Sequence, residues 1–246
     1  MQNHLRTAVV TGASRGFGRA IAAALVAGGT DVVGIARNGP ELDAVRGELG
    51  PAFTPVAGDA TGDALAEEVI RTRRPGLLVL NAGATPPMAP VQEQTWESFS
   101  RNWEVDTRHV FAWTGAALRA PLAPGSVVLS VSSGAALGGS PLSGGYASAK
   151  AAIRYLRQYG DEEARRAGLG IRFVTLLPDM TPAGGVGEAG VTGYAARTGV
   201  SREAFIEGRQ PILTLERIGR AVVELAGTPD SGPEYRIGGA GLSPVG

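Results

Sequence analysis

Three side chains in the sequence have the types and the spacing that suit proton transfer to an oxygen atom. Tyr146 and Lys150 stand four positions apart, and Ser133 precedes the tyrosine by thirteen. Because four residues make about one turn of a helix, the phenol and the ammonium would share one helix face. A cation beside a phenol favours the phenolate, which turns a poor proton donor into a usable general acid or base. Ser133 can hold a substrate oxygen next to that acid.

A tyrosine and a lysine four residues apart can also belong to an ordinary solvent-exposed helix face. A glycine-rich segment near the start of the chain favours the catalytic interpretation. Thr11–Gly18 reads TGASRGFG; it follows the apolar run Ala8–Val10 and leads into the alanine-rich stretch Arg19–Ala27. A strand, a glycine turn and a helix start in succession bind phosphate, since glycine lets the backbone approach the anion and the first helical N–H groups face it. The apolar run Asp31–Ile35 completes a βαβ unit within about 30 residues. We therefore predict a dinucleotide site ahead of the reactive trio.

With these motifs the chain resembles the short-chain dehydrogenase/reductase family, of the ketoreductase kind, from about Leu5 to Gly241. Asn81–Gly83, after the apolar run Leu77–Leu80, matches the family's Asn-Ala-Gly signature. Asp59 matches the acidic residue that meets the adenine ring. Ser133, Tyr146 and Lys150 match the family's catalytic residues in order and spacing.

The resemblance implies a role for each member of the trio. Tyr146 exchanges a proton with the substrate oxygen, Ser133 steadies that oxygen, and Lys150 holds the nicotinamide ribose while favouring the ionised phenol. It also implies a bound dinucleotide. The residues that we expect to contact it are Gly12, Ser14, Arg15, Gly16, Phe17, Gly18, Arg37, Asp59, Ala60, Asn81, Ala82, Gly83, Tyr146, Lys150, Pro178 and Thr181.

One departure from the family pattern falls inside the catalytic group. Where relatives carry an asparagine whose main chain holds a water of the proton relay, this chain has Asp106. We count Asp106 among the catalytic residues, because an ionised carboxylate near Lys150 would offset part of the cation's effect and stabilise the neutral phenol of Tyr146. That effect favours reduction over alcohol oxidation near neutral pH. The alternative is an Asp106 that is solvated or paired with Arg108, with no effect on the chemistry.

Three further departures limit the inference. Asp179 replaces the glycine that commonly follows Pro178, and Ala183 replaces a threonine that binds the carboxamide of the cofactor in relatives. We expect Thr181 to substitute for that threonine. His109, where relatives often have glycine, is interpreted as a packed or interface histidine rather than as a catalyst.

The end of the second apolar run bears on the choice of cofactor. Relatives that prefer NAD place a carboxylate there, which bonds the ribose hydroxyls, whereas this chain has Ala36 followed by Arg37. Arg15, in the glycine segment, lies on the same side. Two guanidinium groups suit a 2′-phosphate, which they bind through charge-assisted, bidentate hydrogen bonds. The pair predicts NADP(H) as the cofactor.

The framework that must position these residues is a parallel sheet. Apolar runs alternate with helical patterns along the chain, which is typical of a parallel sheet covered on both faces. We expect an α/β fold: a single Rossmann-type, doubly wound domain over residues 1–246 with about seven strands. Further strands are expected near 53–57, 77–80, 126–131, 171–177 and 235–237, and helices near 40–49, 63–73, 96–118, 146–166 and 215–226.

A glycine-rich segment, residues 179–213, interrupts this alternation where the chain leaves the sixth strand. Ligands of open α/β sheets bind beyond the carboxyl ends of the strands, so we interpret the segment as a substrate lid. The alternative is a mobile surface loop with a short helix near 202–208. The candidates for apolar lid contacts are Met180, Val186, Val191, Tyr194 and Phe205.

The overall composition excludes several other classes of protein. The 23 basic and 23 acidic residues balance, which leaves no global attraction to nucleic acid or to an anionic membrane. The chain has no cysteine and only two histidines, His4 and His109, so we expect no metal site. We see neither a signal segment nor an apolar run near the ~18 residues of a membrane span, and we expect a cytoplasmic protein.

These observations favour an NADPH-dependent carbonyl reductase, or the reverse alcohol dehydrogenase, acting on a small or medium organic substrate. Two alternatives keep the same fold: recruitment for non-redox chemistry such as dehydration, isomerisation or cyclisation, and cofactor sensing without turnover. The intact trio argues against a sensor. Because relatives pair through two long helices, the resemblance also implies a homodimer or homotetramer, formed through residues 96–118 and 146–166. The tail Gly238–Leu242 is a further candidate contact.

Overall fold

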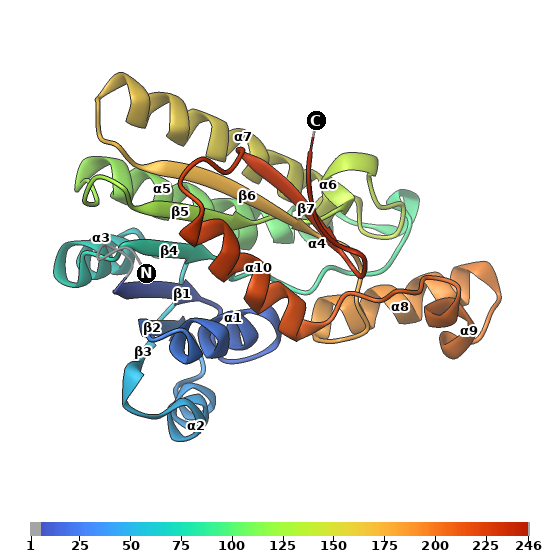
Figure 1. The fold of residues 1–246 in the computed structure, drawn as a ribbon. Helices are drawn as coiled ribbons and strands as arrows, with labels where there is room; N and C mark the ends of the chain where they lie inside the picture. Colours follow the sequence, from blue (N-terminus) through green and yellow to red (C-terminus); the bar gives the residue numbers. More distant parts are fainter. Residues whose placement is uncertain (1–5, 246) are drawn as a thin grey trace.

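A computed structural model of the chain describes residues 6–245; Met1–Leu5, with His4 among them, and Gly246 lie outside the described residues. Its centre is one sheet of eight strands in the order β3-β2-β1-β4-β5-β6-β7-β8 (Figure 1). β1 to β7 run parallel, and β8 returns antiparallel to β7. The strands are β1 Thr7–Thr11, β2 Asp31–Ala36, β3 Phe53–Ala57, β4 Leu77–Leu80, β5 Val127–Val131, β6 Arg172–Pro178, β7 Glu234–Gly238 and β8 Gly241–Pro244.

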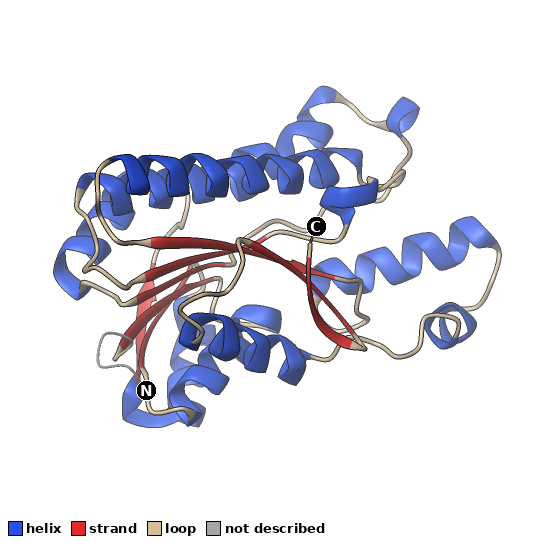
Figure 2. Ribbon diagram, turned by 45° about the horizontal axis from the view of Figure 1, so that its top comes forward, coloured by secondary structure: helices blue, strands red, loops and turns tan. Residues whose placement is uncertain are grey.

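Helices cover both faces of the sheet (Figure 2), as the alternating pattern predicts. α1, α2 and α10 pack on one face, and α3, α5 and α7 on the other. The helices are α1 Gly16–Ala27, α2 Gly39–Leu49, α3 Asp63–Arg73, α4 Trp96–Asn102, α5 Arg108–Arg119, α6 Ala135–Gly138, α7 Gly144–Arg166, α8 Gly185–Thr198, α9 Arg202–Glu207 and α10 Leu215–Gly227, with short 3-10 turns at Gly50–Ala52 and Val91–Glu93.

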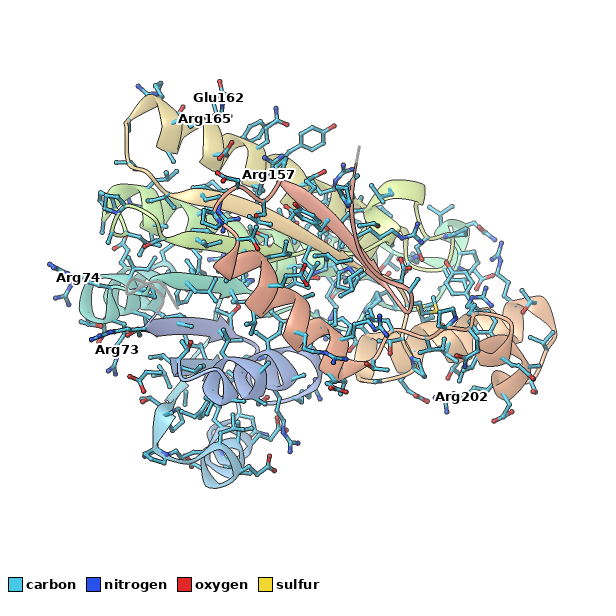
Figure 3. All side chains as sticks on the ribbon, in the orientation of Figure 1. Arg73, Arg74, Arg157, Glu162, Arg165 and Arg202 are labelled. Atoms are coloured by element: carbon cyan, nitrogen blue, oxygen red, sulfur yellow. The ribbon has the colours of Figure 1, made fainter. Side chains whose placement is uncertain are left out.

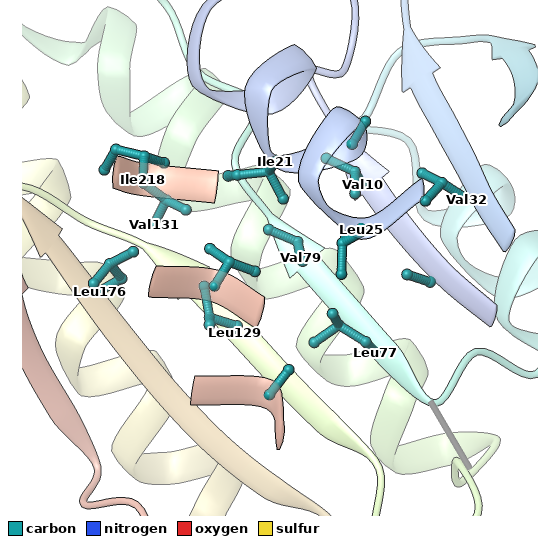
Figure 4. Packing of buried hydrophobic residues seen from close by; sticks show 14 of the residues in the cluster. Val10, Ile21, Leu25, Val32, Leu77, Val79, Leu129, Val131, Leu176 and Ile218 are labelled. Carbon is teal, nitrogen blue, oxygen red and sulfur yellow. The ribbon is translucent and has the colours of Figure 1, made fainter. Parts of the chain in front are cut away.

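The core explains why the inner strands are apolar throughout. Every residue of β4 and β5 is buried, because helices cover both sides of these strands. On the α1 and α10 face, Ile21, Leu25 and Ile218 pack against the strand side chains Val79 and Leu129 (Figure 4). On the opposite face Trp113 of α5 is fully buried. The two apolar layers fix the sheet, and the sheet fixes the loops at its carboxyl edge.

Two expectations about the elements need correction. The helix expected over 96–118 is interrupted by a π-helical turn, η4 (Trp103–Thr107), which separates α4 from α5. The segment 179–213, for which the alternative is a surface loop with one short helix near 202–208, contains two helices, α8 and α9, which project together from the sheet (Figure 1). That alternative is therefore wrong in its secondary structure. The two helices have their own small core of Val191, Ala195 and Phe205.

The sheet also accounts for the C-terminal tail. Ile237 of β7 pairs with Leu242 of β8, so Gly238–Leu242 forms a hairpin within the chain. The order reverses between β1 and β4, which leaves a crevice at the carboxyl ends of the two strands. No helix within residues 6–245 is long and apolar enough to cross a membrane.

Candidate active site

One cavity of about 1260 Å³ occupies that crevice and extends to the segment 179–213. It is lined by the glycine loop, the carboxyl ends of the strands, the start of α7 and residues of that segment. All the cofactor and catalytic residues expected from the sequence line it except Gly18. Gly18 is needed beneath the loop, because a Cβ on it would collide with the carbonyl oxygen of Gly12.

The glycine loop leaves the start of α1 open to an anion. Gly12 and Gly16 have φ angles of +68° and +54°, which only glycine adopts without strain. Arg15 occupies the N-cap position, and its side chain makes no capping hydrogen bond. The first turn of α1 contains no acidic residue. The unpaired N–H groups and the positive end of the helix dipole therefore face the cavity, as a phosphate site requires.

Thr11 connects this loop to the Asn-Ala-Gly segment. Its Oγ1 accepts hydrogen bonds from the backbone N–H groups of Asn81 at 2.9 Å and Ala82 at 3.1 Å. The Nδ2 of Asn81 donates back to the Thr11 carbonyl at 3.0 Å. Two neighbouring strand ends are thus held together below the glycine loop, which is the supporting role that the resemblance implies.

His109 belongs to the same support. Its Nε2 lies 3.0 Å from Thr11 Oγ1, its ring packs edge-on against Trp113, and the residue is fully buried. Burial, with a smaller contribution from the charge of Lys150, lowers the pKa of His109 to about 3. The imidazole is therefore neutral across the physiological range. It has a packing role here, as expected.

The β2 end of the cavity is lined by the carboxylate of Asp59 and by the guanidinium groups of Arg15 and Arg37. Asp59 accepts hydrogen bonds at 2.9 Å from the backbone N–H and from the hydroxyl of Thr61, and the backbone bond is the main reason that the pKa of Asp59 is lowered. Arg15 and Arg37 are exposed and line the cavity. Within residues 6–245 neither arginine forms an ion pair with a carboxylate. Their charges are available to a ligand.

Ser133, Tyr146 and Lys150 lie together at the other end of the cavity. Ser133 follows β5, and its Oγ accepts a hydrogen bond from the backbone N–H of Ala135 at 3.2 Å. Tyr146 and Lys150 lie one turn apart near the start of α7, with Lys150 Nζ 5.6 Å from the centre of the Tyr146 ring. The ammonium also donates to the Val131 carbonyl at 3.1 Å. The three side chains therefore line one cavity, as their spacing predicts.

Asp106 is the partner of Lys150. The carboxylate is fully buried, and its Oδ2 lies 3.2 Å from Lys150 Nζ. Its Oδ1 accepts a hydrogen bond from the Ala84 N–H at 2.8 Å. Burial lowers the pKa of Lys150, but the Asp106 carboxylate and then Tyr146 outweigh it, so that the net pKa is raised. Asp106 is therefore neither solvated nor paired with Arg108.

The π-helical turn and a glycine make room for this carboxylate. Asp106 lies within η4, where the helix widens. A Cβ on Gly83 would lie 3.0 Å from Asp106 Oδ2 and 3.1 Å from Oδ1, so a larger residue there would press on the carboxylate. Asn102, which the sequence analysis missed, donates to the Ala84 carbonyl at 2.8 Å and approaches both carboxylate oxygens at 3.4 Å. Its position four residues before Asp106 is the signal that could have identified it.

Asp179 and Thr181, which follow β6, also line the cavity. Asp179 lies at the edge of the cavity, where its Oδ1 accepts a hydrogen bond from Arg236 Nε at 2.7 Å. Thr181 lines the cavity, but its hydroxyl already donates to the Leu213 carbonyl at 2.7 Å. Its oxygen lone pairs, which also accept from the Ala183 N–H at 3.3 Å, are what it could offer a carboxamide.

Of the five lid candidates, four line the cavity and Val191 is packed inside the lid. Tyr194 contributes more than apolar contact, because its hydroxyl lies 2.7 Å from Ser140 Oγ and accepts from the Leu142 N–H at 3.3 Å. Ser140 in turn lies 2.6 Å from Ser143 Oγ. These bonds connect α8 to the loop before α7. This polar connection was not predicted, because Tyr194 was expected to make only apolar contacts.

Comparisons with known proteins agree with this geometry. The sequence profile of the short chain dehydrogenase family matches residues 6–190. A sorbitol dehydrogenase of Cereibacter sphaeroides is 32% identical over 69% of this chain and 68% of that protein. An L-xylulose reductase of Bos taurus is 30% identical over 73% of this chain and 74% of that protein. A 3-ketoacyl-(acyl-carrier-protein) reductase of Brucella melitensis, solved with NADH, shares the fold with a TM-score of 0.78, at 22% identity over 95% of this chain and 97% of that one.

Proposed function

The chain belongs to the short-chain dehydrogenase/reductase family and is an oxidoreductase of alcohol and carbonyl groups, and we propose that it is a carbonyl reductase that uses NADPH. The observation that carries the proposal is the buried Asp106–Lys150 pair beside Tyr146, with Arg15 and Arg37, which form no ion pair within residues 6–245, at the opposite end of the same cavity. The first supports reduction, and the second supports the phosphorylated cofactor.

The described residues fit a nicotinamide dinucleotide. The uncapped start of α1 suits the pyrophosphate, Asp59 and Ala60 line the adenine end, and Lys150 lines the end where the trio lies. The side chain of Ala36 carries no charge, while Arg15 and Arg37 have cationic groups free for a 2′-phosphate. Glu41 also lines this end and would oppose them in part. The Brucella reductase was solved with NADH, so the fold does not decide the cofactor; the arginines carry that choice.

When bound, the dinucleotide supplies the hydride that is added to the carbonyl carbon. Tyr146 then gives its phenolic proton to the substrate oxygen as a general acid. Ser133 Oγ already accepts from Ala135, which leaves its own O–H free to donate to that oxygen. Lys150 keeps the tyrosine oriented and has a third N–H beyond those directed at Val131 and Asp106.

Asp106 favours one direction of the proposed reaction. Its carboxylate partly cancels the positive charge of Lys150 beside the phenol, so less positive charge is left there to stabilise a phenolate. Reduction needs the phenol as proton donor, whereas alcohol oxidation needs the phenolate. Near neutral pH the arrangement therefore favours reduction of a carbonyl over oxidation of an alcohol.

The proposal is tested by a thermal-shift titration with NADPH, NADP, NADH and NAD, followed by turnover of a panel of ketones and aldehydes. We expect NADPH to bind about tenfold more tightly than NADH and to support reduction. Equal affinity would show that Arg15 and Arg37 do not meet the cofactor. Binding without turnover across the panel would refute the reductase.

We also propose a symmetric homodimer or homotetramer. Phe111 on α5 is 64% exposed, and Tyr155 and Tyr159 on α7, the neighbouring helix, are 59% and 56% exposed. Large exposed apolar groups on adjacent helices are typical of a contact surface. Trp113 and Leu118 pack in the core and do not contribute. A monomeric mass by light scattering at micromolar concentration would contradict the proposal.

A further inference from the structure

Arg236 is an arginine at the edge of the cavity that the proposed chemistry does not use. Its Nε donates to Asp179 Oδ1 at 2.7 Å, and its side chain is 55% exposed. Within residues 6–245 the terminal nitrogens Nη1 and Nη2 have no acceptor. A guanidinium held through Nε alone keeps its two outer N–H groups as a fixed planar fork, which matches a carboxylate in a bidentate manner.

The position of Asp179 is itself closely constrained. Its Oδ2 lies 2.6 Å from where a Cβ on Gly238 would be, and its Oδ1 lies 3.0 Å from where a Cβ on Gly134 would be. A side chain on either neighbour would therefore press on the carboxylate, most of all at Gly238. The Asp179 N–H donates to the Ile237 carbonyl at 2.8 Å, which binds the end of β6 to β7. Arg236 is therefore held by a rigid part of the fold.

This arginine is close to the reacting centre. Gly134, which touches the Asp179 carboxylate, directly follows Ser133, and its N–H donates to the Pro178 carbonyl at 2.8 Å. Ser133 and Asp179 thus follow the ends of β5 and β6, and Arg236 lies within the next strand, β7, opposite Leu177 of β6. Two strand spacings amount to roughly 10 Å. A long side chain such as arginine can cover much of that distance, so a group it binds lies a few bonds from the carbonyl.

A second cation enters the cavity from the lid. The guanidinium of Arg209 lies over the Phe205 ring, 3.4 Å from its centre, and donates to the Phe205 carbonyl at 3.2 Å. The segment after it packs on the end of β7, because a Cβ on Gly239 would collide with the Pro211 carbonyl. Arg209 and Arg236 therefore come from segments in contact. Glu104 of η4 also lines the cavity, from a different element.

We propose that the natural substrate carries a carboxylate, which binds the free fork of Arg236 with Arg209 as a second cation. The substrate class is then a short oxo acid, and the product is the corresponding hydroxy acid. This inference rests on the proposed function for the reaction, but the anion site can be tested without turnover.

Binding is measured by calorimetry on the NADPH complex of Tyr146→Phe, in which we expect turnover to be slower by at least about 100-fold. The probes are oxo acids of four to six carbons and their uncharged methyl esters. We expect an acid to bind at least about tenfold more tightly than its ester. Adding Arg236→Gln should raise the Kd of the acid by about tenfold and change the Kd of the ester by less than about twofold. Arg236→Lys, which keeps a charge beside Asp179, should restore part of the loss.

Arg202→Gln is the matched control, because Arg202 belongs to the lid, pairs with Glu188 and does not line the cavity (Figure 3). It should change neither affinity. Esters that bind as tightly as acids, no acid binding up to about 10 mM, or an equal loss of both probes in Arg236→Gln would each overturn the anion site. Reduction of esters but not acids by the unaltered protein would also overturn it and leave the reductase intact. Acid binding without turnover would refute the reductase alone.

Discussion

The two ends of the cavity hold their cations in opposite ways. At the glycine-loop end, Arg15 and Arg37 are exposed and, among the residues that the structure describes, unpaired with any carboxylate. At the catalytic end, Lys150 is buried and its charge is matched by Asp106 at 3.2 Å. An exposed, unpaired cation has its charge free for a ligand, whereas a buried, paired one acts through its orientation and through the proton equilibrium of its neighbours. The comparison separates the residues that we propose to select the cofactor from those that we propose to direct the chemistry.

The largest effect is expected at the catalytic end, from Tyr146→Phe. Removing the phenolic proton should lower turnover by about 10²–10⁴-fold, the usual contribution of a general acid. NADPH affinity, measured by fluorescence titration, should stay nearly unchanged. Tyr155→Phe makes the same chemical change at an exposed position of the same helix and should leave turnover intact. If Tyr146→Phe keeps more than about a tenth of the rate, Tyr146 is not the acid.

Breaking the buried pair with Asp106→Asn should lower the free energy of unfolding by about 3 kcal/mol at pH 7, because a buried ammonium loses its counterion. The raised pKa of Lys150 means that the pair stabilises the unaltered fold below about pH 10.5 and that this contribution is lost as pH rises through the folded pKa. In the variant, burial without a counterion should lower the pKa of Lys150, so stability recovers as pH rises toward 10. Urea titrations at pH 7 and 10 measure this. If the variant's loss of unfolding free energy relative to the unaltered protein is as large at pH 10 as at pH 7, this prediction is contradicted.

The same variant tests the direction of the reaction. Without the carboxylate, the positive charge of Lys150 is no longer offset beside the phenol. The basic limb of the pH–rate profile for alcohol oxidation should therefore move to lower pH in Asp106→Asn. An unmoved limb, or one displaced upward, would remove Asp106 from the mechanism while leaving its structural role.

At the exposed end, Arg37→Asp should erase or invert the preference for NADPH over NADH, a change of about 1.4 kcal/mol or more. The reason is that a free cation is replaced by a carboxylate that repels the 2′-phosphate and can bond a ribose hydroxyl. Ratios of Kd for the two cofactors give the readout. Arg73→Asp makes the same charge change at the end of α3, outside the cavity, and should not alter the ratio (Figure 3).

The smallest effect is expected where charges are both paired and exposed. Arg165 and Asp161 lie on α7 at 2.9 Å, four residues apart, and the arginine side chain is 73% exposed. Asp161→Asn should change the free energy of unfolding by less than about 0.5 kcal/mol, because water screens the pair. It is the matched control for Asp106→Asn. A loss as large as that at Asp106 would show that burial is not what distinguishes the two pairs.

Residues that lie in motifs or apolar runs could be predicted from the sequence. Val9, Leu78 and Val128 belong to inner strands buried on both faces, so their apolar runs predict a parallel sheet directly. Tyr146 and Lys150 share a helix face because their spacing matches its period. Such features depend on neighbours along the chain.

Features that depend on contacts across the chain could not be predicted from it. The position of Asp106 next to Lys150 needs Gly83 from another strand end and a π-helical turn that no spacing rule indicates. Arg236 resembles any exposed strand residue until Asp179 is placed beside it. α8 has little amphipathic pattern and many glycines, so its helical structure is not evident from its sequence.

The π-helical turn also determines which changes of chain length the catalytic end can accept. A π turn holds one residue more than an α turn, so η4 corresponds to a single-residue insertion in an otherwise continuous helix. Each residue of an α-helix advances by about 100°, so deletion of Thr107 would rotate α5 by that angle relative to Asp106. Either Asp106 would turn away from Lys150, or His109 and Trp113 would leave the core below Thr11. A substitution in η4 changes one side chain and keeps the register of the helix. Loss of that one residue would instead make the contact of Asp106 with Lys150 incompatible with the contact of His109 with Thr11.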